Sequence, residues 1–83
     1  MSGKLITPAE DAALIQFVRW SISSRGYAPT YREIGRKVGL RSSSSVHAHI
    51  ERLVDKGYLT RVAGEPRTLQ TTPEGMEFAI ANN

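Results

Sequence analysis

The chain has 83 residues, of which 40% are hydrophobic and 23% are charged, and this length and balance support one compact core. It contains no cysteine, which excludes disulfide bonds, thiol nucleophiles and sulfur-ligated zinc, and its formal net charge is +3. The longest hydrophobic runs, 12–15 and 78–81, are too short to cross a bilayer, and residues 1–4 lead into no apolar signal segment. We therefore expect a cytoplasmic protein without a membrane partner.

A first helix is predicted to begin after Thr7, because this threonine can cap a free amide, Pro8 suits the first helical position and Glu10 can complete a capping box. Apolar residues then recur at three- and four-residue spacing, which predicts one buried stripe. The stripe consists of Leu14, Phe17, Val18 and Ile22. Residues 23–26 end the pattern, and Trp20 is expected at the edge of the stripe.

A short second helix is predicted next. Thr30 and Glu33 have the spacing of another capping box, and Ile34 and Val38 are its expected core residues. Gly39 follows the helix and can adopt the left-handed backbone that reverses the chain.

A third helix is predicted over about 43–56, beginning within the four serines 42–45 and followed by Gly57. Its inward residues are Val46, His49, Ile50 and Leu53. A step of about 100° per residue places a second stripe on the opposite, exposed side of this helix. This exposed stripe consists of Ser44, His47, Ala48 and Glu51.

A β-hairpin is predicted from two segments rich in β-branched and aromatic residues, 58–61 and 68–72, with a glycine- and proline-containing turn at 62–67. Leu59 and Leu69 are its expected inward residues.

A last short helix is predicted after Thr72, because the threonine is followed by a proline. Met76, Ala79 and Ile80 give this helix a short apolar face, before a polar end at 82–83.

The order of these elements is typical of a winged helix-turn-helix, in which the second helix of the turn motif enters the major groove of DNA. The predicted fold class is α+β and mainly helical, with three helices, a β-hairpin wing and a short C-terminal helix. We assign residues 1–72 to the winged domain and 73–83 to the C-terminal helix and tail. The segment 43–56 is the candidate recognition helix.

The charge is concentrated in the same part of the chain. Eight basic and four acidic residues lie from Arg32 to Arg67, a net charge of +4, against three basic and four acidic residues elsewhere. This distribution suits a polyanionic partner, although a solvated surface of mixed charge can show a similar bias.

The exposed stripe of the candidate recognition helix is small and polar, which suits close approach to base edges. Ser44 and Ser45 can donate or accept hydrogen bonds there, His47 can donate to guanine N7 or O6, and Ala48 permits close approach or meets a thymine methyl group. The alternative is that serines before a helix serve only as caps.

Free amides at the starts of the second and third helices, with nearby hydroxyl and basic groups, are candidate phosphate anchors. The candidate phosphate-contacting residues are Thr30, Tyr31, Arg32, Arg41, Ser43, Arg52, Arg61 and Arg67. From the residues alone, we favour the capping role for Ser42 and Ser43.

Catalytic and metal-binding patterns are missing from the sequence. His47 and His49 point about 200° apart on a helix and cannot share a metal ion, and we expect His49 to be partly buried. There is no evident carboxylate pair, nucleophile with a base, or glycine-rich phosphate loop. We expect no enzymatic activity, no cofactor and no small-molecule substrate.

Residues 26–35 read GYAPTYREIG, and residues 38–50 read VGLRSSSSVHAHI. Together these two segments resemble the N-terminal DNA-binding domain of LexA repressors. The resemblance covers roughly Leu5 to Leu69 and is greatest to the Gram-positive form, in which a serine-rich helix start precedes Val-His-Gly-His-Leu. It implies a winged helix that binds a palindromic operator, usually as half of a two-fold dimer, and represses transcription.

The resemblance also implies which side chains contact bases. These are Ser42, Ser44, Ser45, His47 and Ala48. Ala48 stands where the family usually has glycine. LexA-type repressors continue into a serine–lysine self-cleaving domain, which we do not expect here, so self-cleavage is expected to be absent.

We interpret the sequence as a stand-alone bacterial or phage repressor that binds double-stranded DNA at LexA-like sites. Segment 71–76 is similar to the one after the wing in other small winged-helix regulators, where a following helix often forms dimers. A homodimer through the C-terminal helix or on DNA is therefore a hypothesis. A module that binds another regulator or polymerase, and a binder of structured RNA, are the alternatives.

Overall fold

The computed structural model describes residues 7–65 and 67–82, and within these ranges it contains four helices and a two-stranded sheet. The elements in chain order are α1 (Pro8–Arg25), α2 (Tyr31–Val38), α3 (Ser43–Asp55), β1 (Leu59–Thr60), β2 (Gln70–Thr71) and α4 (Pro73–Ala81). This order confirms the predicted winged helix-turn-helix with a C-terminal helix. Pro66, in the predicted turn, and Asn83 lie outside the described residues.

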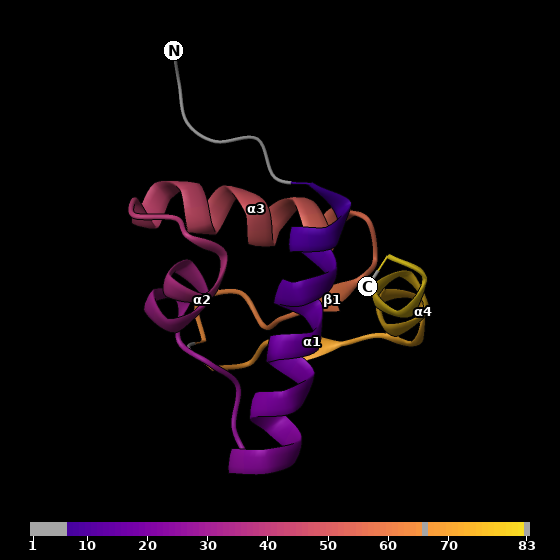
Figure 1. Ribbon diagram of the computed structural model, residues 1–83. Coiled ribbons are helices and arrows are strands. Elements are labelled where there is room, and N and C mark those ends of the chain that lie inside the picture. The colour runs from indigo at the N-terminus through magenta and orange to yellow at the C-terminus, as the bar shows by residue number, and fades with distance from the viewer. Residues whose placement is uncertain (1–6, 66, 83) are drawn as a thin grey trace.

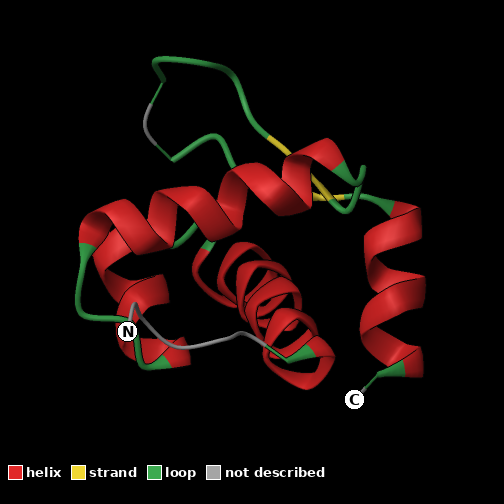
Figure 2. Cartoon of the chain, turned by 90° about the horizontal axis from the view of Figure 1, so that it is seen from above, coloured by secondary structure: helices red, strands yellow, loops and turns green. Residues whose placement is uncertain are grey.

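The helices are grouped around α1. Figure 1 shows α3 lying across one end of α1, with α2 and α4 on opposite sides of it, and α1 also contacts β2. The loop between the two strands extends outward from the helices (Figure 2). Among the described helices, none combines the length and apolar character needed to cross a membrane.

Capping boxes set the starts of α1 and α2. The Thr7 hydroxyl accepts a hydrogen bond from the Glu10 amide at 3.2 Å, and the Glu10 carboxylate accepts one from the Thr7 amide at 3.0 Å. Thr30 and Glu33 make the same pair of bonds at 3.1 and 2.9 Å. Gly39 ends α2 with a φ of 77°, a conformation that residues with a Cβ rarely adopt. The local signals in the sequence therefore place both helices correctly.

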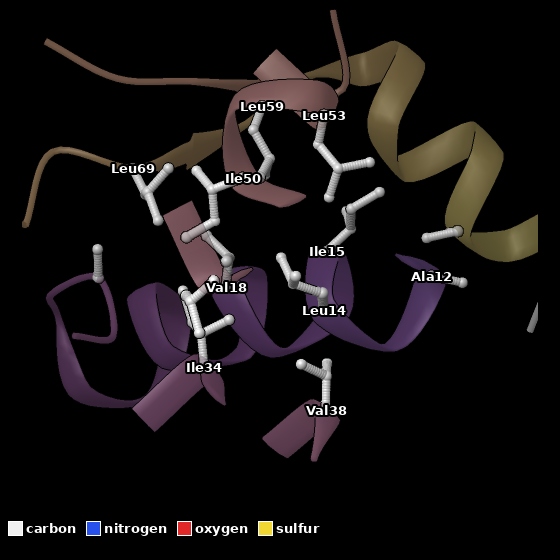
Figure 3. Close-up of a cluster of buried hydrophobic side chains, with 13 residues drawn as sticks. Ala12, Leu14, Ile15, Val18, Ile34, Val38, Ile50, Leu53, Leu59 and Leu69 are labelled. Carbon is white, nitrogen blue, oxygen red and sulfur yellow. The ribbon is translucent and has the colours of Figure 1, made fainter. Parts of the chain in front are cut away.

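The core is a single cluster of side chains from the helices and the hairpin, which converge in Figure 3. Its fully buried large apolar members are Leu14, Ile15, Val18, Ile34, Ile50, Leu53 and Leu59. The inward residues predicted for α3 and the hairpin fit this cluster, because Val46 and Leu69 are also buried and His49 is half-buried. Burial of one side of α3 is therefore confirmed.

The predicted stripe of α1 was partly wrong. Leu14 and Val18 are fully buried, but Phe17 and Ile22 are only half-buried at the edge of the core. Ile15, which a single stripe omits, is fully buried. The reason is that α1 contacts α2, α4 and β2, so more than one narrow face of this helix is covered.

The hairpin is shorter than predicted. Its strands pair antiparallel, with Leu59 opposite Thr71 and Thr60 opposite Gln70. The pairing does not extend over the whole of 58–61 and 68–72, because Thr68 instead uses its hydroxyl to bind the backbone of Val62.

The C-terminal helix packs against α1 and against Tyr58, which lies between α3 and β1. Phe78 stacks on Tyr58 with ring centroids 4.6 Å apart, and Ala79 is fully buried. Ile80, predicted to share the apolar face, was assigned incorrectly to that face, since it is 72% exposed. Gly75, Phe78 and Ala79 have the helical spacing that faces the core, and Ile80 lies beyond this stripe.

Gly75 allows α4 to approach the hairpin closely. A Cβ at this position would lie 2.1 Å from the carbonyl oxygen of Tyr58, a backbone atom. We expect Gly75→Ala to lower the free energy of unfolding by about 1–3 kcal/mol, the usual cost of overpacking, in urea denaturation. Glu77→Ala, at an exposed position of the same helix, is the control and should change stability by less than about 0.5 kcal/mol. Unchanged stability of Gly75→Ala would contradict the close packing.

Candidate nucleic-acid interface

The turn between α2 and α3 is held by short contacts at Gly35. The Leu40 amide donates to the Gly35 carbonyl at 2.8 Å, closing the end of α2. A Cβ at Gly35 would lie 3.0 Å from both the Leu40 carbonyl oxygen and a methyl group of Val46. This close packing sets how α3 follows α2 and which side of α3 faces outward.

The outward side of α3 is the predicted one. Ser44, His47 and Ala48 are exposed, whereas Glu51 is half-buried. Ser42 is the N-cap of α3, and its hydroxyl oxygen accepts a hydrogen bond from the amide of Ser45 at 3.5 Å. The capping role expected for Ser42 is confirmed, and it leaves the Ser42 hydroxyl proton available as a donor.

Of the remaining serines, Ser43 is exposed at the first position of the helix, and Ser45 is half-buried one turn before His49. The predicted base-contacting residues therefore lie together over the first turns of α3. Helical periodicity placed Ser44, His47 and Ala48 on the exposed side of this helix, whereas the complete base-contacting group is what the family resemblance implies.

Tyr31, the first residue of α2, packs against His47 across the turn motif. The two ring centroids are 4.5 Å apart, and the rings meet edge-on with an interplanar angle of 64°. Tyr31 is half-buried, and this burial raises the pKa of its phenol. The hydroxyl is therefore protonated at neutral pH and can donate a hydrogen bond.

A groove of about 600 Å³ separates this pair from the wing. Its lining residues come from the start of α2, the exposed side of α3 and the loop between the strands. They are Pro29, Thr30, Tyr31, His47, Glu51, Arg61, Gly64, Glu65, Arg67, Thr68 and Leu69. The groove thus joins four predicted phosphate-contacting residues to one predicted base-contacting residue.

Two arginines link the wing to α3 and to the loop between α1 and α2. The guanidinium of Arg61 forms an ion pair with the carboxylate of Glu51, and its Nε is buried without a hydrogen-bond partner among the described residues. Arg67 has a left-handed backbone with a φ of 59°, and its guanidinium lies 5.0 Å from the centroid of the Tyr27 ring. These contacts place both ends of the wing loop beside the turn motif.

Arg52 points away from this groove. It donates two hydrogen bonds, at 2.9 and 3.1 Å, to the carboxylate of Asp11 on α1, which is only 4% exposed. Its guanidinium also lies 3.3 Å from Nδ1 of His49. Burial, and then the charge of Arg52, lower the pKa of His49, so this imidazole is neutral at pH 7. Arg52 holds α3 on α1, and the geometry does not support its predicted phosphate contact.

The end of α1 is clamped to the start of α2 by a second ion pair. Arg25 donates two hydrogen bonds of 3.0 Å to Glu33, and the Ser21 hydroxyl accepts further bonds from Arg25. These bonds from Arg25, and then the backbone bond from Thr30, lower the pKa of Glu33 to about 2. The clamp holds the N-terminus of α2, from which Thr30 and Tyr31 reach the groove.

The remaining predicted phosphate anchors lie at or next to the N-termini of α2 and α3. Arg32 and Arg41 are exposed at the starts of α2 and α3, and Thr30 is a half-buried cap.

Sequence reasoning missed Tyr27, which lies between Arg67 and Arg25, with the Arg25 guanidinium 4.7 Å from its ring centroid. No local pattern signals such a contact, because Tyr27 and Arg67 are distant in the chain.

Comparison with known families settles the classification. Residues 6–68 match the family model described as the LexA DNA binding domain. The chain belongs to this family. The resemblance noted in the sequence, from roughly Leu5 to Leu69, is thereby confirmed.

LexA repressors from several bacteria resemble the chain. It is 44% identical over 79 residues to the LexA repressor of Pelotomaculum thermopropionicum, which covers 93% of the chain and 38% of that relative. It is 48% identical over 65 residues to the LexA repressor of Limosilactobacillus fermentum, a match that covers 78% of the chain and 31% of that relative. It is 50% identical over 67 residues to the LexA repressor of Leuconostoc mesenteroides, a match that covers 78% of the chain and 32% of that relative. The chain thus spans about a third of the length of these LexA relatives.

The Arg25–Glu33 clamp predicts a loss of stability in acid. Because the pKa of Glu33 falls from its usual value near 4.5 to about 2 on folding, its stabilising effect is complete above pH 4.5 and is lost as the pH falls toward 2. Glu33→Gln keeps an acceptor for the cap but removes the charge. We expect this variant to unfold at a lower temperature than the parent at pH 7, and the difference to shrink between pH 4.5 and 2.

Glu77→Gln, at an exposed position of α4, removes the same charge outside the clamp and is the control. The role of the clamp would be contradicted if the difference in unfolding temperature between Glu33→Gln and the parent stayed constant from pH 7 to pH 2. It would also be contradicted if the control variant showed the same difference.

Proposed function

We propose that this chain binds double-stranded DNA sequence-specifically and represses transcription, with α3 in the major groove. The observation that carries the proposal is the exposed side of α3. Ser44, His47 and Ala48 project from a helix whose other side is anchored in the core. Membership of the LexA DNA-binding domain family, and relatives named as LexA repressors, support the same function.

The proposed base contacts use the small and polar groups at the start of α3. The residues are Ser42, Ser44, Ser45, His47 and Ala48. The serine hydroxyls and the imidazole supply donors for base acceptors, and Ala48 leaves room for the helix to approach the base edges. Glu51 is bound by Arg61, so its carboxylate is partly neutralised near the DNA backbone.

The proposed phosphate contacts surround this base-contacting group. The residues are Thr30, Tyr31, Arg32, Arg41, Ser43, Arg61 and Arg67. Arg52 is left out because its guanidinium is bound to the buried carboxylate of Asp11. Neutralising phosphates releases counterions, so binding should weaken steeply as the salt concentration rises.

We further propose that two copies bind a palindromic site in the cytoplasm. Ile80, which is 72% exposed on α4, supplies an apolar group for a contact between copies. The part of the LexA relatives that this chain matches is the DNA-binding domain, so we propose action by binding, with no catalytic step.

Selection of bound sequences from a random duplex pool tests the proposal. We expect a palindromic site, whose half-site spacing reports the dimer. Ser44→Ala and His47→Ala should each lose about 1–3 kcal/mol of discrimination at one or two base pairs, because each removes a group that contacts base edges. Selection of no sequence, or retained preference in both variants, would contradict the proposed interface.

The salt dependence separates phosphate contacts from base contacts within the same experiment. Arg41→Ala should weaken binding to all duplexes alike and reduce the slope of log K against log salt concentration by about 1. Arg19→Ala removes the same charge from an exposed position of α1 and is the matched control. Equal slopes for the Arg41 variant and the parent would remove Arg41 from the proposed contacts.

A further inference from the structure

We propose that Tyr31 is a positioning residue for specificity: its ring holds the imidazole of His47 in the orientation that contacts the base edge. The inference rests on the proposed function and deepens it. It assigns Tyr31 a role beyond the phosphate contact expected for its hydroxyl group. The observation that supports it is the edge-on contact between the two rings, whose centroids are 4.5 Å apart at an interplanar angle of 64°.

The backbone that carries Tyr31 is held at several points. Thr30 and Glu33 close the capping box at the start of α2, and Glu33 is bound through both carboxylate oxygens by Arg25. Pro29, on the other side of Thr30, is fully buried. The Tyr31 ring therefore extends from a fixed backbone position and provides a fixed contact surface beside α3.

His47 needs such a contact surface because its side chain is exposed on α3. An exposed side chain samples several staggered rotamers, and a base contact requires one of them. Glu51, one helical turn further on, has its carboxylate bound to Arg61 of the wing. Within the described part of the chain, Tyr31 makes the aromatic ring contact with His47. Ordering the imidazole before binding reduces the entropy lost on the DNA.

The ring and the hydroxyl group of Tyr31 can be tested separately. Phenylalanine keeps the ring beside His47 and removes the hydroxyl group, whereas leucine removes the aromatic contact and keeps an apolar side chain. A phosphate contact depends on the hydroxyl group and is blind to sequence. A positioning role depends on the ring and changes preference only at the base pair that His47 contacts.

The test measures binding to the selected site and to duplexes that differ at single base pairs. His47→Ala first identifies the base pair at which preference is lost. Tyr31→Leu should then lower preference at that same base pair by about three- to tenfold, the effect of losing one preordered side chain, and Tyr31→Phe should keep it. The double variant Tyr31→Leu/His47→Ala should be no less selective there than His47→Ala alone.

A measurement on the free chain keeps the inference testable without DNA. The ring current of Tyr31 should shift the NMR signals of the His47 imidazole protons in the parent and in Tyr31→Phe. These shifts should be lost in Tyr31→Leu, while amide signals of the core show that the fold is retained. Unchanged His47 signals in Tyr31→Leu would overturn the inference.

The outcomes separate the inference from the proposed function. A parent that selects no DNA sequence overturns the proposed function and the inference together. If the parent is selective but Tyr31→Leu weakens binding to all duplexes equally, the inference alone is overturned. The same holds if Tyr31→Phe loses as much base preference as Tyr31→Leu.

Discussion

One side of α3 is buried in the core, and this burial determines which side of the helix faces outward. Ile50 and Leu53 are fully buried, and Arg52 beside them binds the buried carboxylate of Asp11 with two hydrogen bonds. Moving or rotating α3 would expose apolar surface and leave a buried charge without its partner, both of which are costly. Because one side of α3 is held inward, the side with Ser44 and His47 is held outward.

The elements around α3 complete the surface. The Arg25–Glu33 pair holds the start of α2, where Tyr31 packs on His47, and Arg61 joins the wing to Glu51. Each contact links a part of the proposed DNA-binding surface to its neighbour. These contacts hold the turn motif and the wing in a fixed relative position, which reduces the entropy lost on binding.

The parts of the fold that depend on local sequence were predictable. The capping boxes at Thr7 and Thr30 and the glycine at position 39 set the helix boundaries, and a 3.6-residue period separated the two sides of α3. Contacts between distant residues were not predictable. Arg52 meets Asp11 across 41 positions, so the sequence gives no sign that this arginine is occupied.

The same limit explains the other corrections. Ile80 was assigned to the apolar face of the last helix because hydrophobicity does not reveal which neighbours α4 meets, and the structure places Phe78 there instead. The exposed side of α3 was predictable because it lies on one helix, whereas its supporting contacts to Tyr31 and the wing come from tertiary packing.

NMR titration of the labelled chain with a duplex carrying its selected site shows which residues meet the DNA. We expect amide signals to shift most along the first turns of α3, at the start of α2 and in the wing loop, and least around Trp20 on α1. Shifts concentrated on α1 or α4, with the signals of Ser44, His47 and Ala48 unchanged, would contradict this expectation.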